Sequence, residues 1–167
     1  MLDTTLKTEH LILSPLTQKD AEFMFPIWAN TEVTHFMDID PFKEIKQAQD
    51  MIALFQQLIL SDSAVRYKIT YNNHIIGSAG YNEFTITNSG KSVEVGYELA
   101  KKYWRKGFGT ELLNALCSYV FETLNCTEVT ANIAPGNKAS QNLVKKLNFK
   151  LISTDSEGDY IFSNIRK

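Results

Sequence analysis

The central stretch of the chain reads Val93-Glu-Val-Gly-Tyr-Glu-Leu-Ala-Lys-Lys-Tyr-Trp-Arg-Lys-Gly-Phe-Gly-Thr110. From Val93 to Leu99, apolar residues alternate with Glu or Gly, and this period of two indicates a β-strand. From Thr110 to Leu124, apolar residues recur every three or four positions, which predicts an amphipathic helix of about four turns. The stretch therefore predicts a strand, a glycine-containing loop and a helix in direct succession.

A strand, a glycine loop and a helix in this order can bind phosphate. The first backbone N–H groups of a helix have no partner within it, and the helix dipole favours an anion there. Gly107 and Gly109 remove side chains that would hold a pyrophosphate away, and Arg105 and Lys106 add positive charge. Many strand–helix turns use glycine for packing alone, so this stretch by itself leaves a structural turn and an anion site open.

Length and composition favour one domain over residues 1–167, large enough to bury a single core. Hydrophobic residues make up 44% and charged residues 22%, as in ordinary globular proteins. The formal net charge of −2 gives no overall attraction for nucleic acid or anionic membranes, so neither is expected as a partner. The N-terminus has no secretion pattern and no apolar run approaches membrane-spanning length, so we expect a cytoplasmic protein.

The cysteines and histidines do not have the spacing of a disulfide framework or a metal site. Cys117 falls on the apolar face of the predicted helix, where a buried thiol is expected, and Cys126 follows that helix. His10, His35 and His74 are scattered. We therefore expect no metal.

The rest of the chain is expected to form further strands and helices around this centre. Besides the strand at 93–99, strands are predicted at residues 9–14, 65–71, 75–81 continued by the overlapping segment 80–86, 127–134, 149–154 and 160–165, and helices from Thr17, from residue 45 and over 138–147. This order implies an α/β fold with a mixed, twisted sheet and helices on both faces. Parallel pairing is required only by the crossovers through helices 110–124 and 138–147.

Three segments resemble the GNAT superfamily of acetyl-CoA-dependent N-acyltransferases, and together they extend over almost the whole chain. Residues 8–16 are similar to the opening strand of the RimJ/RimL-like branch, which contains the ribosomal-protein N-terminal acetyltransferases. Residues 96–110 resemble the CoA motif of that branch, and residues 137–149 resemble its second motif, an Asn and a Ser three apart before a helix ending in Leu-Gly-Phe. The resemblance implies a mostly antiparallel, seven-stranded sheet with helices on both faces.

Two residues depart from the superfamily pattern. Trp104 stands where the loop usually begins with Gln or Arg, although Trp is familiar at that position in the RimJ/RimL-like branch. Asn148 replaces the glycine of Leu-Gly-Phe, and Asn tolerates a left-handed conformation better than most residues. Backbone N–H groups hold most of the pyrophosphate, so we expect CoA binding to persist.

The resemblance implies acetyl-CoA as co-substrate. It puts the pantetheine arm beside the edge of the central strand, the pyrophosphate on the loop from Arg105 to Thr110, and the amide of Asn137 near the thioester. Asn137 is also a suitable helix cap, and both roles can coexist. The cofactor-binding residues implied in this way are Tyr97, Glu98, Leu99, Trp104, Arg105, Lys106, Gly107, Phe108, Gly109, Thr110 and Asn137.

Catalytic groups follow from the same resemblance. Ser140 lies where the branch has a serine near the CoA sulfur, so it is the expected acid, although a residue of the first helical turn is the alternative. Relatives that use a tyrosine have it at the position of Val144, where that mechanism is unavailable. Of the strand carboxylates Glu94 and Glu98, Glu94 is the expected base, acting through water; a solvent-facing carboxylate is the competing interpretation. Asn132 takes a position where some relatives carry a catalytic glutamate, and an amide cannot act as a base.

The sequence therefore predicts an N-acetyltransferase that passes the acetyl group of acetyl-CoA to a primary amine by direct attack in a ternary complex. The acceptor stays open between a protein N-terminus, such as that of a ribosomal protein, and a small amine. A CoA-binding module without turnover is the alternative, favoured by Val144 and Asn132. A P-loop protein is not supported, because no Gly-Lys-Ser/Thr follows the loop. A monomer and a homodimer both remain open.

Overall fold

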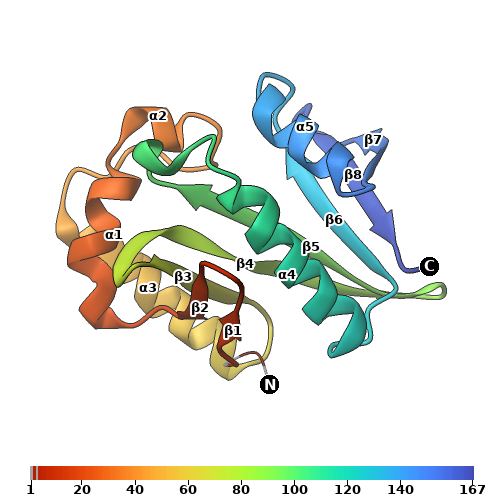
Figure 1. Ribbon diagram of the computed structural model, residues 1–167, viewed down its shortest axis with the longest axis horizontal. Coiled ribbons are helices and arrows are strands. Elements are labelled where there is room, and N and C mark those ends of the chain that lie inside the picture. The colour runs from red at the N-terminus through yellow and green to blue at the C-terminus, as the bar shows by residue number, and fades with distance from the viewer. Residues whose placement is uncertain (1, 3) are drawn as a thin grey trace.

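One twisted sheet of eight strands runs through the molecule in the order β1-β2-β3-β4-β5-β6-β8-β7 (Figure 1). This computed structural model describes residue 2 and residues 4–167. The strands are β1 (Leu6–Lys7), β2 (Ile12–Pro15), β3 (Val65–Tyr71), β4 (His74–Thr87), β5 (Gly90–Leu99), β6 (Glu128–Ile133), β7 (Lys150–Thr154) and β8 (Tyr160–Ile165). The helices are α1 (Ala21–Trp28), α2 (Thr31–Thr34), α3 (Ile45–Leu60), α4 (Phe108–Glu122) and α5 (Lys138–Lys146), with short 3₁₀ turns at Gln18–Asp20 and Lys101–Tyr103.

The α/β class and the mostly antiparallel sheet are confirmed, but the expected number of seven strands is wrong. The additional strand is β1, whose two residues pair with β2 and are too few to produce a visible periodicity. The expected parallel pair across the 138–147 helix is also wrong. β8 lies between β6 and β7 and is antiparallel to both, so β5 and β6 form the one parallel pair in the described sheet.

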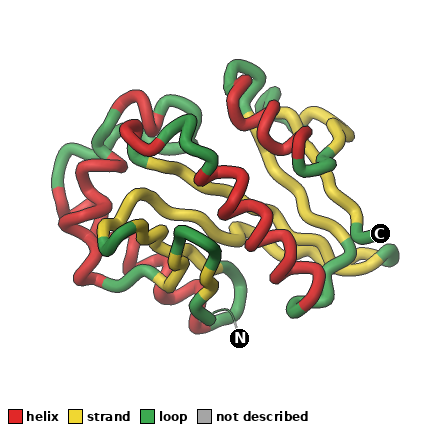
Figure 2. The backbone as a smooth tube through the Cα atoms, viewed as in Figure 1, coloured by secondary structure: helices red, strands yellow, loops and turns green. Residues whose placement is uncertain are grey.

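The helices cover the sheet from both sides, as predicted (Figures 1 and 2). α4 and α5 lie in front of the sheet in Figure 1, and α3 lies behind it, with α1 packed against α3. The main core lies between α4 and the sheet and includes Tyr67, Tyr81, Leu112, Leu116 and Val129. A second core joins α1 to α3 around Trp28, Met24 and Ile52. In the described chain, no helix is long and apolar enough to cross a membrane.

α4 begins at Phe108, two residues before its expected start, because Gly107 caps it in a left-handed conformation with φ of 85°. Its apolar side is buried, and Asn114 and Ser118 are exposed on the other side, which confirms the predicted amphipathic helix. Cys117 is buried on the apolar side, as expected.

β4 spans the overlapping segments predicted as strand at residues 75–81 and 80–86. It is one strand with a register shift, in which Tyr81 pairs with Val95 while Glu83 pairs with Glu94, and Asn82 is the extra residue. Such a β-bulge interrupts the alternation of side chains, bends the strand and increases its twist. The bulge lies beside Glu94, the last residue at which β5 pairs with its other neighbour, β6.

Candidate active site

β5 and β6 pair only over their first residues and then separate. The pairing joins residues 92–94 of β5 to residues 128–130 of β6, and the two strands do not pair over the rest of their described lengths. A cavity of about 100 Å³ lies in the gap that follows. It is lined by Val95, Gly96 and Tyr97 of β5, Ala131, Asn132, Ile133 and Ala134 on β6 and after it, Leu113 of α4, Asn137, Ser140 and Val144 at α5, and Phe36.

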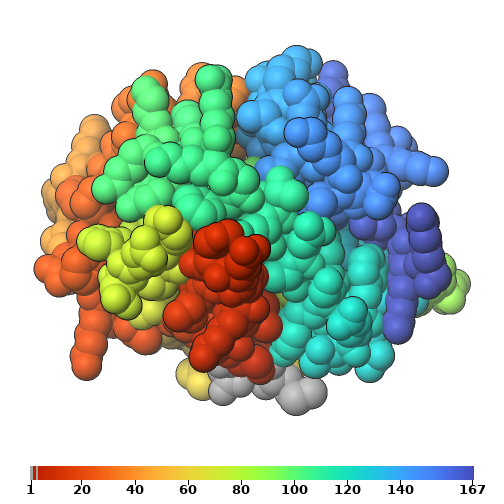
Figure 3. Space-filling view, in the orientation of Figure 1, coloured from red at the N-terminus to blue at the C-terminus, as the bar shows by residue number. Residues whose placement is uncertain are grey.

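A larger cavity of about 540 Å³ adjoins this gap on the side of α4 and α5. Tyr97, Asn137, Ser140 and Phe36 line both cavities, so the two spaces meet at these residues. In the space-filling view of Figure 3, the green surface of the loop before α4 and the blue surface of α5 lie beside each other along the top of the molecule; these are two walls of the larger cavity.

The loop before α4 has the geometry of an anion site. The first hydrogen bond of the helix runs from the N–H of Glu111 to the carbonyl of Gly107, so the N–H groups of Phe108, Gly109 and Thr110 have no partner within the helix. A Cβ built on Gly107 meets no heavy atom within 4 Å, which leaves the approach to these N–H groups open. A diphosphate therefore fits this helix N-terminus by charge and by space.

Gly109 has a different role from Gly107. A Cβ on Gly109 would lie 2.7 Å from Cδ1 of Leu143 and 3.3 Å from the hydroxyl oxygen of Tyr97. Glycine at this position lets α4 pack closely against α5 and β5. Gly109 therefore fits the packing interpretation of the Gly-x-Gly pair, and Gly107 fits the anion-binding interpretation.

Trp104 connects the loop to the end of β5. Its indole Nε1 donates a hydrogen bond of 2.7 Å to the carbonyl of Leu99. On the other side of β5, the N–H of Ala100 donates to Ile76 of β4. Because alternate residues of a strand turn their backbone groups to the same edge, Tyr97 and Leu99 present theirs to the larger cavity. This edge is where an extended pantetheine arm can add as another strand.

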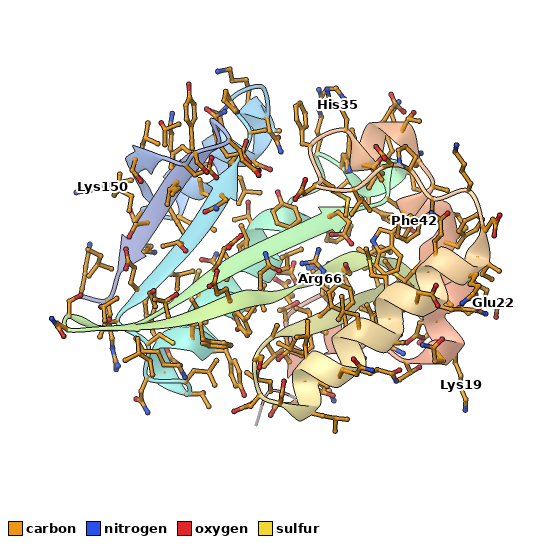
Figure 4. All side chains as sticks on the ribbon, turned by 180° about the vertical axis from the view of Figure 1, so that it is seen from behind. Lys19, Glu22, His35, Phe42, Arg66 and Lys150 are labelled. Atoms are coloured by element: carbon orange, nitrogen blue, oxygen red, sulfur yellow. The ribbon has the colours of Figure 1, made fainter. Side chains whose placement is uncertain are left out.

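The side chain of Glu98 is buried on the opposite face of the sheet, where it is 5% exposed. Its carboxylate pairs with the guanidinium of Arg66 and accepts hydrogen bonds from Ser78 and from Nε1 of Trp28, the latter at 2.8 Å. Arg66 also donates to the carbonyl of Gly96 at 3.3 Å. Figure 4 shows Arg66 in the middle of this face. Glu98 is therefore committed to a structural network, which leaves Glu94 as the available strand carboxylate.

Glu94 lies on the same face, two residues before Gly96, and is half-buried. Burial raises the pKa of Glu94, and the nearby charges of Glu83 and Asp155 raise it further, against the opposing effect of a hydrogen bond from Asn82. The amide nitrogen of Asn82 lies 3.3 Å from the carboxylate. The bulge in β4 therefore supplies the group that orients this carboxylate.

Ser140 and Asn137 lie at the N-terminus of α5. The side chain of Asn137 accepts a hydrogen bond of 3.2 Å from the N–H of Ser140, which confirms the predicted helix cap. Gln141 donates to the carbonyls of Ala134 and Pro135 and anchors the helix to the end of β6. Ser140 lies in the first turn of α5 and lines both cavities, a position that is compatible with either interpretation of this residue.

Most of the predicted cofactor residues come together in the larger cavity. Those that line it are Tyr97, Glu98, Leu99, Trp104, Arg105, Gly107, Phe108, Gly109, Thr110 and Asn137, whereas Lys106 does not. Sequence reasoning missed Phe36 and Lys146 on its walls, and Asn82, Asp155 and Arg66 on the opposite face. The ring of Phe36 comes within 3.2 Å of a Cβ position on Gly136, across the mouth of the gap, and no local motif marks it.

Comparison with known proteins identifies the family. Residues 10–150 match the family model of the acetyltransferase (GNAT) domain. The chain belongs to the GNAT acetyltransferase family. The uncharacterized N-acetyltransferase p20 of Bacillus licheniformis is 35% identical over 148 residues, which are 87% of this chain and 82% of that protein. The uncharacterized N-acetyltransferase YoaA of Bacillus subtilis is 31% identical over 147 residues, with the same coverage of 87% and 82%.

Solved structures of acetyltransferases share the fold. RimL, a ribosomal L7/L12 alpha-N-protein acetyltransferase in complex with coenzyme A, superposes with a TM-score of 0.87 at 15% identity over 97% of this chain and 98% of RimL. RimJ of Mycobacterium smegmatis, in complex with CoA-disulfide, gives a TM-score of 0.87 at 12% identity over 98% of this chain and 88% of RimJ. The expected family and its RimJ/RimL-like architecture are confirmed.

The protein is thus an acetyl-CoA-dependent acetyltransferase, as the sequence predicted. Acetyl-CoA is its co-substrate, and the open approach to Gly107 beside a cavity of about 540 Å³ fits that molecule. The described residues contain no group of three or more His, Cys, Asp or Glu side chains placed to hold a metal ion.

Proposed function

We propose that this acetyltransferase transfers the acetyl group to a primary amine that enters from the sheet face opposite α4. The observation that carries the proposal is the cavity in the gap between β5 and β6. Its lining includes Leu113 and Val144 from the helices in front of the sheet, and Gly96 and Asn132 from strand positions of the other face. Acetyl-CoA that enters from the side of α4 can place its thioester in this gap, and an amine can reach the thioester from the other side.

Acetyl-CoA is expected to bind with its pyrophosphate on the N–H groups at the start of α4, from Arg105 to Thr110. Its pantetheine arm follows the edge of β5 at Tyr97 and Leu99 toward the gap. The direction agrees with the positions of the two cavities, because the larger one contains Gly107 and the smaller one contains Val95. Arg105 adds a positive charge on the wall of the larger cavity.

Glu94 is the proposed base. An alkyl amine arrives as an ammonium ion and must lose a proton before it can attack. A carboxylate whose pKa is raised by burial is a better proton acceptor than an ordinary one. Glu94 lines neither cavity, so we propose that a water molecule carries the proton from the amine in the gap to its carboxylate. Glu83 and Asp155, whose charges act on Glu94, favour a cationic amine on this face.

Ser140 is the proposed acid. The amine nitrogen forms a bond to the thioester carbon, and the carbonyl oxygen gains negative charge, which a backbone N–H of β5 between residues 95 and 97 stabilises. The carbon–sulfur bond then breaks, and the thiolate takes a proton from the hydroxyl group of Ser140. Asn137 fixes Ser140 by capping the same helical turn.

The transfer is proposed to be direct, without an acetyl-enzyme. Cys117 and Cys126 are both buried and unbridged, and burial raises the pKa of Cys117 to about 12. Burial also raises the pKa of Cys126. Thiols that stay protonated are poor nucleophiles. The double substitution Cys117→Ala/Cys126→Ala should leave turnover largely intact, whereas an isolated acetyl-enzyme that passes its acetyl group to an amine would contradict direct transfer.

The acceptor we propose is the N-terminal amine of a protein, such as a ribosomal protein. RimL, which shares the fold, is named for acetylating the N-terminus of ribosomal L7/L12, and the carboxylates around Glu94 favour an ammonium group. The test is release of CoA from acetyl-CoA with peptides that have a free N-terminus, with the same peptides Nα-acetylated as matched controls. Polyamines and aminoglycosides form the comparison set. Preference for a small amine would overturn this acceptor, and acetyl-CoA binding without turnover on any amine would overturn the transfer itself.

A further inference from the structure

The hydroxyl group of Tyr97 lies where three elements of the site meet. Tyr97 is on β5, its hydroxyl is next to the side chain of Ser140 of α5, and the same oxygen lies 3.3 Å from a Cβ position on Gly109 in the first turn of α4. Both Tyr97 and Ser140 line the larger cavity and the gap. The phenol is therefore located where the thioester end of acetyl-CoA is proposed to lie.

The phenol group of Tyr97 can act as a proton donor. Among the residues that line the gap, all of which belong to the described chain, Tyr97 is the one with an ionisable side chain. Burial raises the pKa of Tyr97, and Ser140 opposes that rise because its hydroxyl can donate a hydrogen bond to the phenolate. The phenol therefore stays protonated around neutral pH, while its ionised form has a partner already in place.

A serine hydroxyl alone is a poor proton source for a leaving thiolate. Proton transfer is efficient when the donor and the acceptor have similar pKa values. A thiol ionises near a pKa of about 8.5 and a phenol near about 10, whereas serine does not ionise in the range where proteins work. The phenol behind Ser140 is therefore a closer match to the thiolate than Ser140 itself.

We propose that Tyr97 is a positioning residue that supplies the proton which Ser140 delivers to the CoA sulfur. Its hydroxyl donates to Oγ of Ser140, which leaves the proton of Ser140 free to point into the gap. This inference rests on the proposed function, because it assigns the origin of the proton in the same transfer.

The proton movements balance without another reactant. When the carbon–sulfur bond breaks, its electron pair stays on sulfur, and sulfur takes the proton of Ser140. Oγ of Ser140 takes the proton of Tyr97 in the same step, so no free alkoxide forms. The phenolate of Tyr97 keeps the hydrogen bond from Ser140 and regains a proton from water after the product leaves.

The first test uses Tyr97→Phe, which keeps the ring in its packing position and removes the hydroxyl. We expect kcat to fall by about 10- to 100-fold, at or below the usual range for one acid–base group, with little change in KM for acetyl-CoA. The pair Tyr97→Phe/Ser140→Ala should be no slower than Ser140→Ala alone, because both groups act on one proton. Rates measured across mixtures of H₂O and D₂O should depend nonlinearly on deuterium content for the wild type and linearly for Tyr97→Phe.

The matched control is Tyr71→Phe. Tyr71 ends β3, its ring lies 4.7 Å from that of Phe108 between centroids, and it lines neither cavity. It loses a phenol hydroxyl from the same side of the sheet and should keep wild-type kcat. A Tyr97→Phe enzyme with wild-type kcat, or losses that multiply in the double variant, would overturn the relay.

A second test needs no acceptor amine. The ultraviolet absorbance of the thiolate reports the pKa of the CoA thiol in the binary complex. Hydrogen-bond donation from the Tyr97–Ser140 pair should lower that pKa in the wild type and in Tyr71→Phe, and Tyr97→Phe and Ser140→Ala should both raise it again. A thiol pKa that responds to Ser140→Ala but not to Tyr97→Phe overturns the relay. Failure of the wild type to acetylate any amine would instead overturn the proposed function, while a thiol shift in Tyr97→Phe would still support the relay.

Discussion

The two sides of the gap between β5 and β6 are assembled in different ways. On the side of α4, half of the residues that line the larger cavity come from one run of the chain, residues 97–110, which contains Gly107 and Gly109 before and at the start of the helix. On the opposite side, side chains from distant segments meet: Arg66 of β3, Asn82 of β4, Glu94 of β5 and Asp155 from the β7–β8 turn. A cofactor shared by a whole family can be held by one local motif, whereas the acceptor face depends on the sheet.

The largest effect that would sharpen this comparison is expected from Glu94→Gln. Loss of the base should lower kcat by about 10²- to 10⁴-fold. The dissociation constant of acetyl-CoA should not change, because Glu94 lies on the other side of the sheet. Steady-state kinetics and calorimetric titration measure the two quantities, with Glu22→Gln, at an exposed glutamate of α1 that lines neither cavity, as control.

The pH dependence of the rate provides a second test of the same variant. The pKa of Glu94 is raised above 4.5, and the base must be ionised, so the wild-type rate should increase as pH rises through that higher value. Glu94→Gln should lose this limb of the profile. An unchanged limb in the variant would assign the base to another group.

Arg66→Met should have the next largest effect, on stability. The side chains of Arg66 and Glu98 are only 11% and 4% exposed, so the substitution leaves a buried carboxylate without its cation. Such a loss typically costs about 3–5 kcal/mol of the free energy of unfolding. Urea denaturation measures it, and Arg66→Met/Glu98→Gln should recover part of the loss.

The control for Arg66 is Lys101→Met. Lys101 pairs with Glu32 at 2.7 Å, but both side chains are 54% exposed, and such pairs contribute little. Equal destabilisation by Arg66→Met and Lys101→Met would show that the buried network does not hold the acceptor face together.

Gly107→Ala and Gly109→Ala should separate anion binding from packing. Alanine at position 107 must adopt φ of 85°, which lowers the stability of the free and the bound protein alike, and its methyl group narrows the approach to the helix N-terminus. The narrowed approach should lower acetyl-CoA affinity by about tenfold, which corresponds to 1.4 kcal/mol. Gly109→Ala should lower the unfolding temperature with little change in affinity, because its methyl group meets Leu143 and Tyr97. The reverse pattern in binding and melting experiments would contradict this division.

The smallest effect is expected at the contact between the N-terminal segment and α4. The strand predicted at residues 9–14 forms only from Ile12 as β2, because the N–H and Nδ1 of His10 bond to the carboxylate of Glu111, at 2.7 and 2.9 Å. The hydrogen bond to Glu111 raises the pKa of His10. Burial opposes ionisation of Glu111, but hydrogen bonds from Thr8 and His10 hold its pKa below the ordinary value.

The sign of the pH effect follows from these two shifts. The contribution of His10 is complete below its unfolded pKa of 6.5 and is lost as pH rises through the higher folded value. The contribution of Glu111 is complete above 4.5 and is lost as pH falls through the lower folded value. His10→Ala should therefore lower the melting temperature most between pH 4.5 and 6.5, by a small amount because His10 is exposed. A uniform decrease at every pH would contradict this origin.

The sequence by itself determined the parts of the site that are local in the chain. The capping box of Thr17 and Asp20, the cap at Asn137 and the left-handed Asn148, with φ of 67°, each depend on residues within a few positions. The same is true of the strand, loop and helix around Gly107. Local hydrogen bonds and side-chain periodicity set these features, so they could be predicted.

Only the tertiary structure decided which strand carboxylate is available and which side chains surround the gap. Glu94 and Glu98 occupy equivalent positions in the alternation of β5, yet Arg66, Ser78 and Trp28 surround Glu98, while Glu94 is half-buried beside the bulge at Asn82. Likewise, nothing in the local sequence brings the hydroxyl of Tyr97 to Ser140. These contacts join strands and helices far apart in the chain, and they arise only when the sheet twists and β5 separates from β6.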